Sequence, residues 1–134
     1  MSAEIQSPKF NWVEARAVCS LLPVFKKLQM DVSDDAQTLN RLRGGSLQII
    51  EVAVNEKGTL FSVFSGSGEK AAVEFSLHSD YIKIATRKST FTLTLTLDND
   101  CRCKLRVVED SKDERVLEQW QVRRLVLEDL FFNT

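Results

Sequence analysis

The sequence predicts an α+β fold with helices at both ends of the chain and an antiparallel sheet between them. Three observations support this prediction: apolar residues recur at helical spacing over residues 11–45, alternate with polar residues over 46–109, and return to helical spacing over 113–132. Helices that flank a run of strands commonly pack on one face of an antiparallel sheet. We therefore expect N-terminal helices, a curved antiparallel β-meander of about six strands and a closing C-terminal helix.

A single domain is expected over residues 1–134, because a chain of this length buries a hydrophobic core without disulfides or bound metal. Apolar residues make up 43% of the chain and charged residues 28%, which is the balance of a soluble globular protein. Residues 1–10 contain few large apolar side chains, so we expect them to form a loose lead-in.

The first helix is predicted from its cap and its apolar stripe. Asn11 followed three residues later by Glu14 matches a capping box, which places the helix start near Trp12. Pro23 lies within the helical pattern and removes a backbone donor, so we expect a kink or break near residues 21–22. The stripe consists of residues spaced by four and three: Val13, Ala17, Leu21, Val24 and Leu28.

A second, shorter helix is predicted to follow the first. Asp34 and Gln37 form another capping-box pattern, and Gly44 with Gly45 supplies a stop. The first 45 residues are therefore expected to form two helices, or one bent helix, that lead into the sheet.

The clearest strand covers residues 90–97, where threonine and large apolar residues alternate without interruption. This alternation indicates one buried and one solvent-facing side. Turn residues separate it from similar segments, and the expected strands are 50–54, 60–64, 71–77, 81–86, 90–97 and 103–107.

The C-terminal helix carries more apolar residues than packing on a sheet requires. Its main apolar arc covers about half of the helical wheel and contains Val116, Leu117, Trp120, Val126, Leu127, Leu130 and Phe131. Val122, Leu125 and Phe132 fall on the far side, and such surplus on a terminal helix is typical of a partner or dimer interface. The alternative is that the N-terminal helices or the end of the chain cover these three residues.

A basic face is expected on the last two strands. If they form a hairpin, Arg102, Lys104 and Arg106 stand beside the threonine row, where hydroxyls and cations suit phosphate or carboxylate groups. The alternative is that threonine is simply a good strand former and that the cations protect an exposed strand from aggregation.

A ligand cavity between helix and sheet is a further hypothesis. The inward residues Phe61, Phe75, Phe91, Leu93 and Leu95 would line it and hold an apolar molecule. A filled core is the alternative, and the sequence does not separate the two.

The cysteine content favours an intracellular location. The chain has three cysteines, Cys19, Cys101 and Cys103, and in a secreted protein an odd number would leave one unpaired. We therefore expect free structural thiols in a reducing compartment, the cytoplasm. The chain contains a single histidine, so we expect no metal site at Cys101 and Cys103. The N-terminus does not resemble a signal peptide, and no apolar run approaches the ~20 residues that span a bilayer.

Catalysis is not expected. The single histidine, His78, precedes Ser79 and Asp80, but adjacent residues on an extended chain point in different directions and do not form a triad. Gly66 and Gly68 lack the following helix and lysine of a phosphate-binding loop, so we expect no cofactor. A formal net charge of −1 provides no general attraction to nucleic acid.

Over residues 47–132, a β-meander followed by a helix containing Trp120 resembles pleckstrin-homology-type domains, whose last helix has a tryptophan there. The chain departs from them in its 45 preceding, largely helical residues and in lacking a basic first hairpin. No binding residue is carried across.

We therefore expect a non-catalytic intracellular protein–protein interaction module, such as a small subunit, an adaptor or a homodimer, that uses its C-terminal helix. The alternative is a binding domain for a small apolar ligand or an anionic headgroup.

Overall fold

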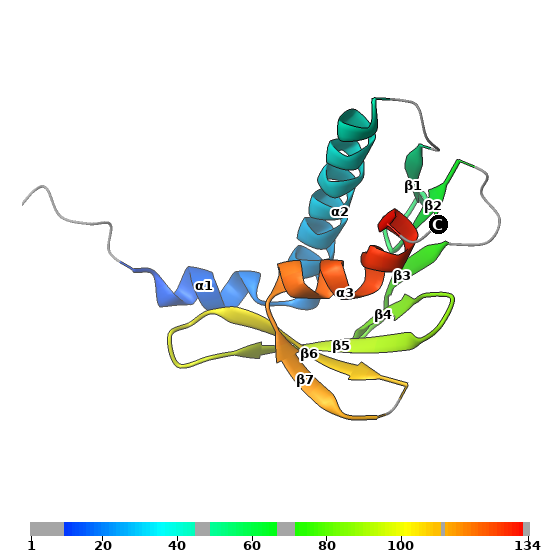
Figure 1. Ribbon diagram of the computed structural model, residues 1–134. Helices are drawn as coiled ribbons and strands as arrows, with labels where there is room; N and C mark the ends of the chain where they lie inside the picture. The colour runs from blue at the N-terminus through cyan, green and yellow to red at the C-terminus, as the bar shows by residue number, and fades with distance from the viewer. Residues whose placement is uncertain (1–9, 45–48, 67–71, 111, 133–134) are drawn as a thin grey trace, which may run out of the picture.

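The computed structural model describes residues 10–44, 49–66, 72–110 and 112–132, and it confirms the α+β class (Figure 1). The described part of the chain contains three helices and seven strands. In chain order these are α1 (Trp12–Val18), α2 (Leu21–Arg43), β1 (Ile50–Val54), β2 (Leu60–Ser65), β3 (Val73–Leu77), β4 (Ile82–Ala85), β5 (Thr90–Leu97), β6 (Cys103–Glu109), β7 (Glu114–Leu117) and α3 (Gln119–Phe132). The lead-in expected over residues 1–10 lies outside the described residues except for Phe10.

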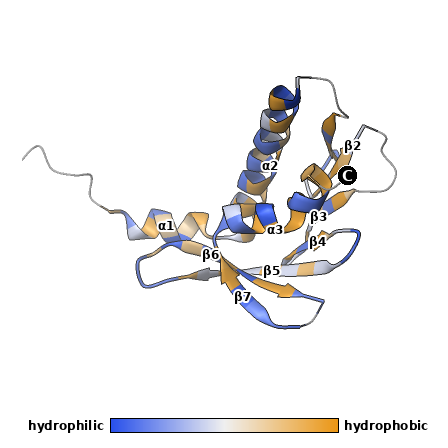
Figure 2. Cartoon of the chain, in the orientation of Figure 1, coloured by the Kyte–Doolittle hydropathy of each residue, from blue (hydrophilic) through white to orange (hydrophobic). Residues whose placement is uncertain are grey.

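The sheet is an open antiparallel meander in which each strand pairs with its neighbours in sequence, from β1 to β7. Apolar residues alternate with threonine along β5 (Figure 2), and the register places Leu93 opposite Val107 and Thr94 opposite Arg106. Leu93 and Val107 are buried, whereas Arg106 is exposed. One face of the sheet is therefore apolar, and α2 and α3 pack on it.

Three phenylalanine rings fill the space between α2 and the sheet. Phe25 of α2 lies with its ring centroid 5.2 Å from that of Phe61, which stacks at 4.4 Å on Phe75. All three side chains are fully buried. Phe91 and Leu93 are also in the core as expected, and Leu95 is half-buried.

The start of the helical region agrees with the cap and the break that the sequence predicts. The backbone N–H of Glu14 donates to Oδ1 of Asn11 at 3.0 Å, which confirms the predicted cap. The expected break also occurs, but α1 ends at Val18 and α2 begins at Leu21. Pro23 is thus the third residue of a new helix, where a backbone N–H would have no intrahelical partner.

The prediction of a separate helix starting near Asp34 is wrong, because α2 is continuous from Leu21 to Arg43. Val32, Ala36 and Leu39 extend the buried stripe of the helix across this point, so burial against the sheet outweighs the local capping signal. The predicted stop is confirmed: Gly44 adopts a left-handed conformation with φ 65° and caps α2.

The prediction of one helix over residues 113–132 is also wrong at its start. Residues 114–117 form β7, and α3 begins only at Gln119. β7 pairs with β6 and places Leu117 opposite the buried Leu105, so these residues cover a sheet edge instead of extending a helix. The sheet of the described residues therefore has seven strands, which agrees with the expected meander of about six strands and adds β7 to the segments named from the sequence.

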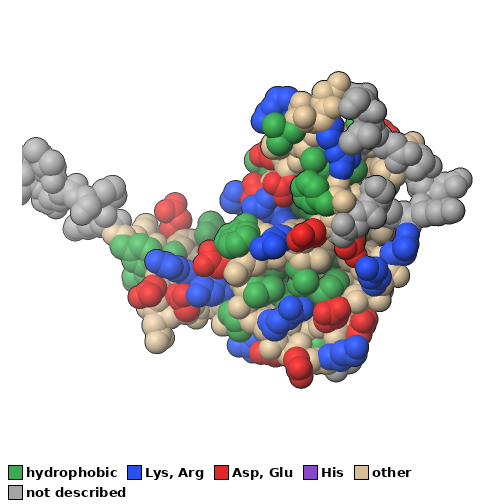
Figure 3. All heavy atoms as spheres, in the orientation of Figure 1, with side chains coloured by type: hydrophobic (Ala, Val, Ile, Leu, Met, Phe, Trp, Pro, Cys, Tyr) green, Lys and Arg blue, Asp and Glu red, His purple; other side chains and the backbone are tan. Residues whose placement is uncertain are grey.

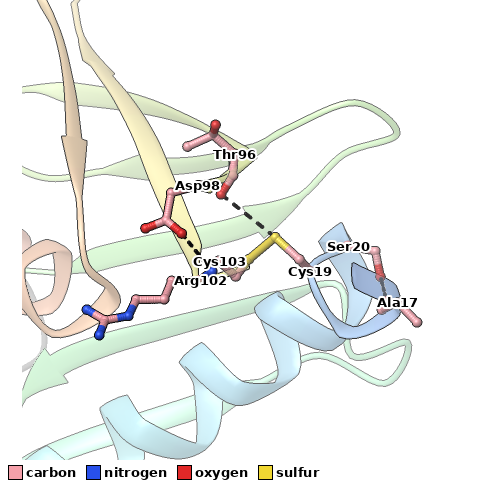
Figure 4. The surroundings of a disulfide bond; sticks show 7 residues. All are labelled: Ala17, Cys19, Ser20, Thr96, Asp98, Arg102 and Cys103. Carbon is pink, nitrogen blue, oxygen red and sulfur yellow. Dashed lines mark hydrogen bonds between the residues drawn. A yellow bond between two sulfur atoms is a disulfide. The ribbon is translucent and has the colours of Figure 1, made fainter. Parts of the chain in front are cut away.

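A disulfide replaces two of the three expected free thiols. Cys19, which follows α1, bonds to Cys103 at the start of β6, with a Cα–Cα distance of 5.4 Å (Figure 4). Cys101 is the free cysteine and is half-buried. No cluster of metal-ligating side chains occurs among the residues that the structure describes.

An amide side chain holds the edge strand β1 to α2. Asn40 donates from Nδ2 to the carbonyl oxygen of Ile50 at 2.9 Å, and its Oδ1 accepts from the N–H of Ile50 at 2.8 Å. The side chain thus satisfies both backbone groups of Ile50 on the outer edge of β1.

Of the helices described, none combines the length and apolar character that a membrane-spanning helix requires.

Replacing Asn40 with alanine is expected to lower the free energy of unfolding by about 1–3 kcal/mol, because both backbone groups of Ile50 lose their partner. Urea denaturation measures this change. Gln37→Ala, an exposed position on the same helix, is the control and should change stability by less than about 0.5 kcal/mol. Equal effects of the two variants would contradict the role of Asn40.

Alkylation tests the disulfide. Protein denatured without a reductant should take up one iodoacetamide label per chain, at Cys101, because Cys19 and Cys103 are bonded. After reduction, all three cysteines should be labelled. Peptide mass spectrometry identifies the sites, and three labels before reduction would show that the bond is absent.

Candidate functional site

The three residues predicted to face a partner lie in three different environments. Val122 is fully buried, Leu125 is half-buried against the core, and Phe132 is 65% exposed. The expected position of Val122 on the outer side of the helix is therefore wrong. Val116 and Leu117, which the predicted arc included, belong to strand β7 and not to this helix. The buried residues of α3 are Val122, Val126, Leu127, Leu130 and Phe131.

Exposed apolar side chains instead gather where α2 and α3 lie side by side. Leu42 is 73% exposed, Phe132 65% and Trp120 51%. Trp120 was expected to pack on the sheet, but it is the second residue of α3 and its side chain is half exposed at the start of the helix. Figure 3 shows groups of apolar side chains on this side of the molecule, with charged side chains between them.

These side chains border a depression that we call the α2–α3 groove, with a volume of about 430 Å³. Its apolar lining consists of Leu39, Leu42, Trp120, Leu127, Phe131 and Phe132. Charged residues from both helices, among them Asp35 and Glu128, stand at its rim.

A second depression, the junction groove, lies where the start of α2, the start of α3 and β6 meet. Its volume is about 650 Å³. The apolar residues that line it are Val18, Pro23, Val24, Leu105 and Trp120, and its charged residues are Lys27, Asp31, Arg102, Lys104, Glu118 and Arg123. Trp120 lines both grooves, so it is the centre of this apolar surface.

A chain of polar contacts joins α2 to α3 between the two grooves. Gln119 donates from Nε2 to Asp31 at 3.0 Å and accepts from Nε of Arg123 at 2.8 Å. Arg123 also forms an ion pair with Asp35 at 2.5 Å, and Lys27 forms one with Asp31 at 3.0 Å. These contacts fix the first turns of α3 against the middle of α2.

The same contacts determine the acidity of Asp31. Partial burial by itself would raise its pKa, but hydrogen bonds from Lys27 and Gln119 and the nearby charges of Lys27 and Arg123 outweigh burial. The pKa of Asp31 is therefore lowered below 3.8.

The basic face predicted on β5 and β6 exists, but carboxylates accompany two of its cations. The register places Thr96 beside Lys104 and Thr94 beside Arg106, as expected for a hairpin. Arg106 lies 3.3 Å from Glu114, and Lys104 lies 3.6 Å from Asp98. Arg102 lines the junction groove. The three cations therefore do not form one uncompensated anion site.

The pKa of Asp98 is also lowered, chiefly because its carboxylate accepts a hydrogen bond from the backbone N–H of Arg102. A second backbone N–H, that of Asp100, and the nearby Lys104 act in the same direction. Asp98 thus organises the turn between β5 and β6 (Figure 4).

His78 lies at an exposed strand end. Its Nε2 is 3.0 Å from Oγ of Ser76, and its ring stacks on Tyr81 with centroids 4.6 Å apart. These contacts join residues two and three positions away in sequence, as expected for a turn.

Comparisons with protein-family models, with curated proteins and with solved structures found no match to this chain. The element order that resembles pleckstrin-homology-type domains is present, although Trp120 stands in the first turn of α3 and not at its centre. The site must therefore be interpreted from its own geometry.

Sequence reasoning placed Trp120 on the apolar arc that packs on the sheet and did not predict that Leu42 is exposed, so it missed both residues. A wheel drawn for one helix shows its apolar side but not which part of that side a neighbouring helix covers. Leu42 lies one turn beyond the last buried residue of α2, Leu39, and this position near the helix end was the available signal.

The pH dependence of stability tests the polar contacts of Asp31. Because its folded pKa is lowered, the carboxylate stabilises the fold above pH 3.8, and this contribution is lost as the pH falls through the folded pKa. Asp31→Asn should therefore destabilise the protein near neutral pH by up to about 1 kcal/mol and have little effect in acid. Urea denaturation at several pH values measures this, with the exposed Asp34→Asn as control. An effect of Asp31→Asn that persists in acid would contradict the assignment.

Proposed function

We propose that the protein is a non-catalytic protein–protein interaction module that binds its partner on the surface formed by α2 and α3. The observation that carries the proposal is the exposure of Leu42, Trp120 and Phe132 around two adjoining grooves. Protein interfaces commonly have such an apolar centre, often with a tryptophan, and a polar rim that remains wet.

The energetics support a binding role for this surface. Burying one large apolar side chain contributes about 1.5–3 kcal/mol, so a partner that covers Leu42, Trp120 and Phe132 gains several kcal/mol before the cost of association is subtracted. The polar contacts between Gln119, Asp31 and Arg123 hold the two helices in place, so little further ordering is needed on binding.

The intracellular location expected from the cysteines remains part of this proposal. The bond between Cys19 and Cys103 leaves one free cysteine, Cys101, where three were expected, and it does not by itself indicate a compartment.

A small apolar ligand is the second candidate, and one observation favours it: both groove volumes fall within the range of about 300–1,000 Å³ typical of small-molecule sites. The site would then be a surface groove and not the space between α2 and the sheet, which Phe25, Phe61 and Phe75 occupy. Displacement of a fluorescent apolar probe, compared between wild type and Trp120→Ser, separates this candidate from the first.

Replacing Leu42 and Phe132 together with aspartate tests the proposed surface. Both side chains are more than half exposed, so the fold should persist, as circular dichroism will show. Affinity capture from native extract, quantified by mass spectrometry, should retain specific partners with the wild type and lose them with the double variant.

Val116→Asp is the matched control, because Val116 is 51% exposed but stands on the opposite face of the sheet beside Arg106. It should retain the same partners as the wild type. Equal capture by all three proteins would overturn the proposed surface.

A further inference from the structure

The disulfide between Cys19 and Cys103 is the main attachment of α1 to the sheet. Of the seven residues of α1, Ala15 is half-buried and the other six are exposed. The helix makes little contact with any other described element, and in Figure 1 it extends away from α2 and α3. A helix of seven residues is marginal in water by itself, so the order of α1 depends on what holds its ends.

The two ends of α1 are held in different ways. At the N-terminal end, the bond from the N–H of Glu14 to Asn11 joins the helix only to its own cap. At the C-terminal end, Cys19 is buried and its sulfur is bonded to Cys103 at the start of β6 (Figure 4). This sulfur also lies 3.9 Å from the carbonyl oxygen of Thr96, but a thiol is a weak donor. Opening the bond would leave α1 joined to the body by the backbone and by weak contacts alone.

The core does not depend on this bond. Neither cysteine belongs to the hydrophobic core that α2, α3 and the sheet share. The ring contact of Phe25 with Phe61 and the hydrogen bonds of Asn40 to Ile50 hold α2 on the sheet without it. The bond also restricts the unfolded chain, so reduction lowers the stability of the whole fold, but these contacts of α2 persist in the native state. Opening the bond should therefore release α1 and leave the sheet folded.

The junction groove gives a reductant access to the bond. Cys103 is half-buried and lines this groove together with Val18, the last residue of α1. Thiol–disulfide exchange requires a thiolate to approach one sulfur atom of the bond. The groove, with a volume of about 650 Å³, has room for a small thiol at Cys103.

We propose that the Cys19–Cys103 bond is a redox-sensitive switch: closed, it holds α1 beside the junction groove, and opened by a dithiol, it releases α1 while the core persists. One thiol of the dithiol loses its proton and attacks Sγ of Cys103, and Cys19 leaves as a thiolate and takes up a proton. The second thiol of the reductant loses its proton and attacks the mixed disulfide, which releases Cys103 as a thiolate that is protonated in turn. The reductant becomes a disulfide, and two electrons and two protons pass to the protein.

The switch goes beyond the proposed function. The proposed intracellular location suits it, because disulfides in reducing compartments are usually transient or redox-sensing. Opening the bond, however, depends neither on that location nor on partner binding. The capture experiment with Leu42 and Phe132 concerns the α2–α3 groove, so either proposal can fail without the other.

Reduction of the folded protein by dithiothreitol tests whether the bond opens in the native state. Free thiols, counted by alkylation after acid quenching and denaturation, should rise from one to three per chain. The rate should stay constant at urea concentrations below the unfolding transition, because the sulfur of Cys103 is attacked in the folded protein. A rate that rises steeply with urea would mean that the chain must unfold first, and it would overturn the switch.

Nitrogen-15 relaxation measures the release of α1. In the oxidised protein the order parameters of the α1 amides should lie near the value of about 0.85 of rigid backbone, and after reduction they should fall below about 0.6. Those of β2 and β3 should not change. Cys103→Ser should give the low values with or without dithiothreitol. Cys101→Ser, which keeps the bond, is the matched control and should behave like the wild type in both states.

Order parameters of α1 that do not change on reduction would overturn the switch. A loss of order in α1 and in the sheet together would overturn it as well, because the bond would then hold the whole fold. Should Cys103→Ser fail to fold, the oxidised and reduced forms of the wild type still decide between these results.

Discussion

The contact between Phe25 and the aromatic pair Phe61–Phe75 sets the position of α2 on the sheet, and the remaining architecture depends on it. Each of these rings is fully buried, and together they anchor α2 over β2 and β3. An antiparallel sheet with one apolar face needs such a cover. Once α2 covers one part of that face, α3 covers the part that remains. The two grooves follow because two helices packed side by side on a curved sheet leave depressions between their outer surfaces.

Two further sets of contacts determine which side chains lie at these grooves. The polar contacts of Gln119 and Arg123 hold the start of α3 against α2, where Val122 is in the core and Trp120 is half exposed. The disulfide of Cys103 fixes the end of α1 beside the junction groove. Apolar exposure here therefore results from contacts that hold the helices in place, and it does not reflect a missing part of the core.

Most of the fold could be predicted from the sequence because its strands alternate cleanly and its first helix has a clear cap. The errors have physical causes. Val116 and Leu117 suit a strand or a helix, and the unpaired edge of β6 decides between them. Asp34 begins a capping-box pattern, but α2 continues past it because Val32 and Ala36 are buried against the sheet. The pairing of Cys19 with Cys103 depends on two segments 84 residues apart, which local patterns do not bring together.

The site was harder to predict than the fold, since exposure of an apolar residue depends on which neighbours cover it. Trp120 and Val122 are two residues apart in one helix, yet one is half exposed and the other fully buried.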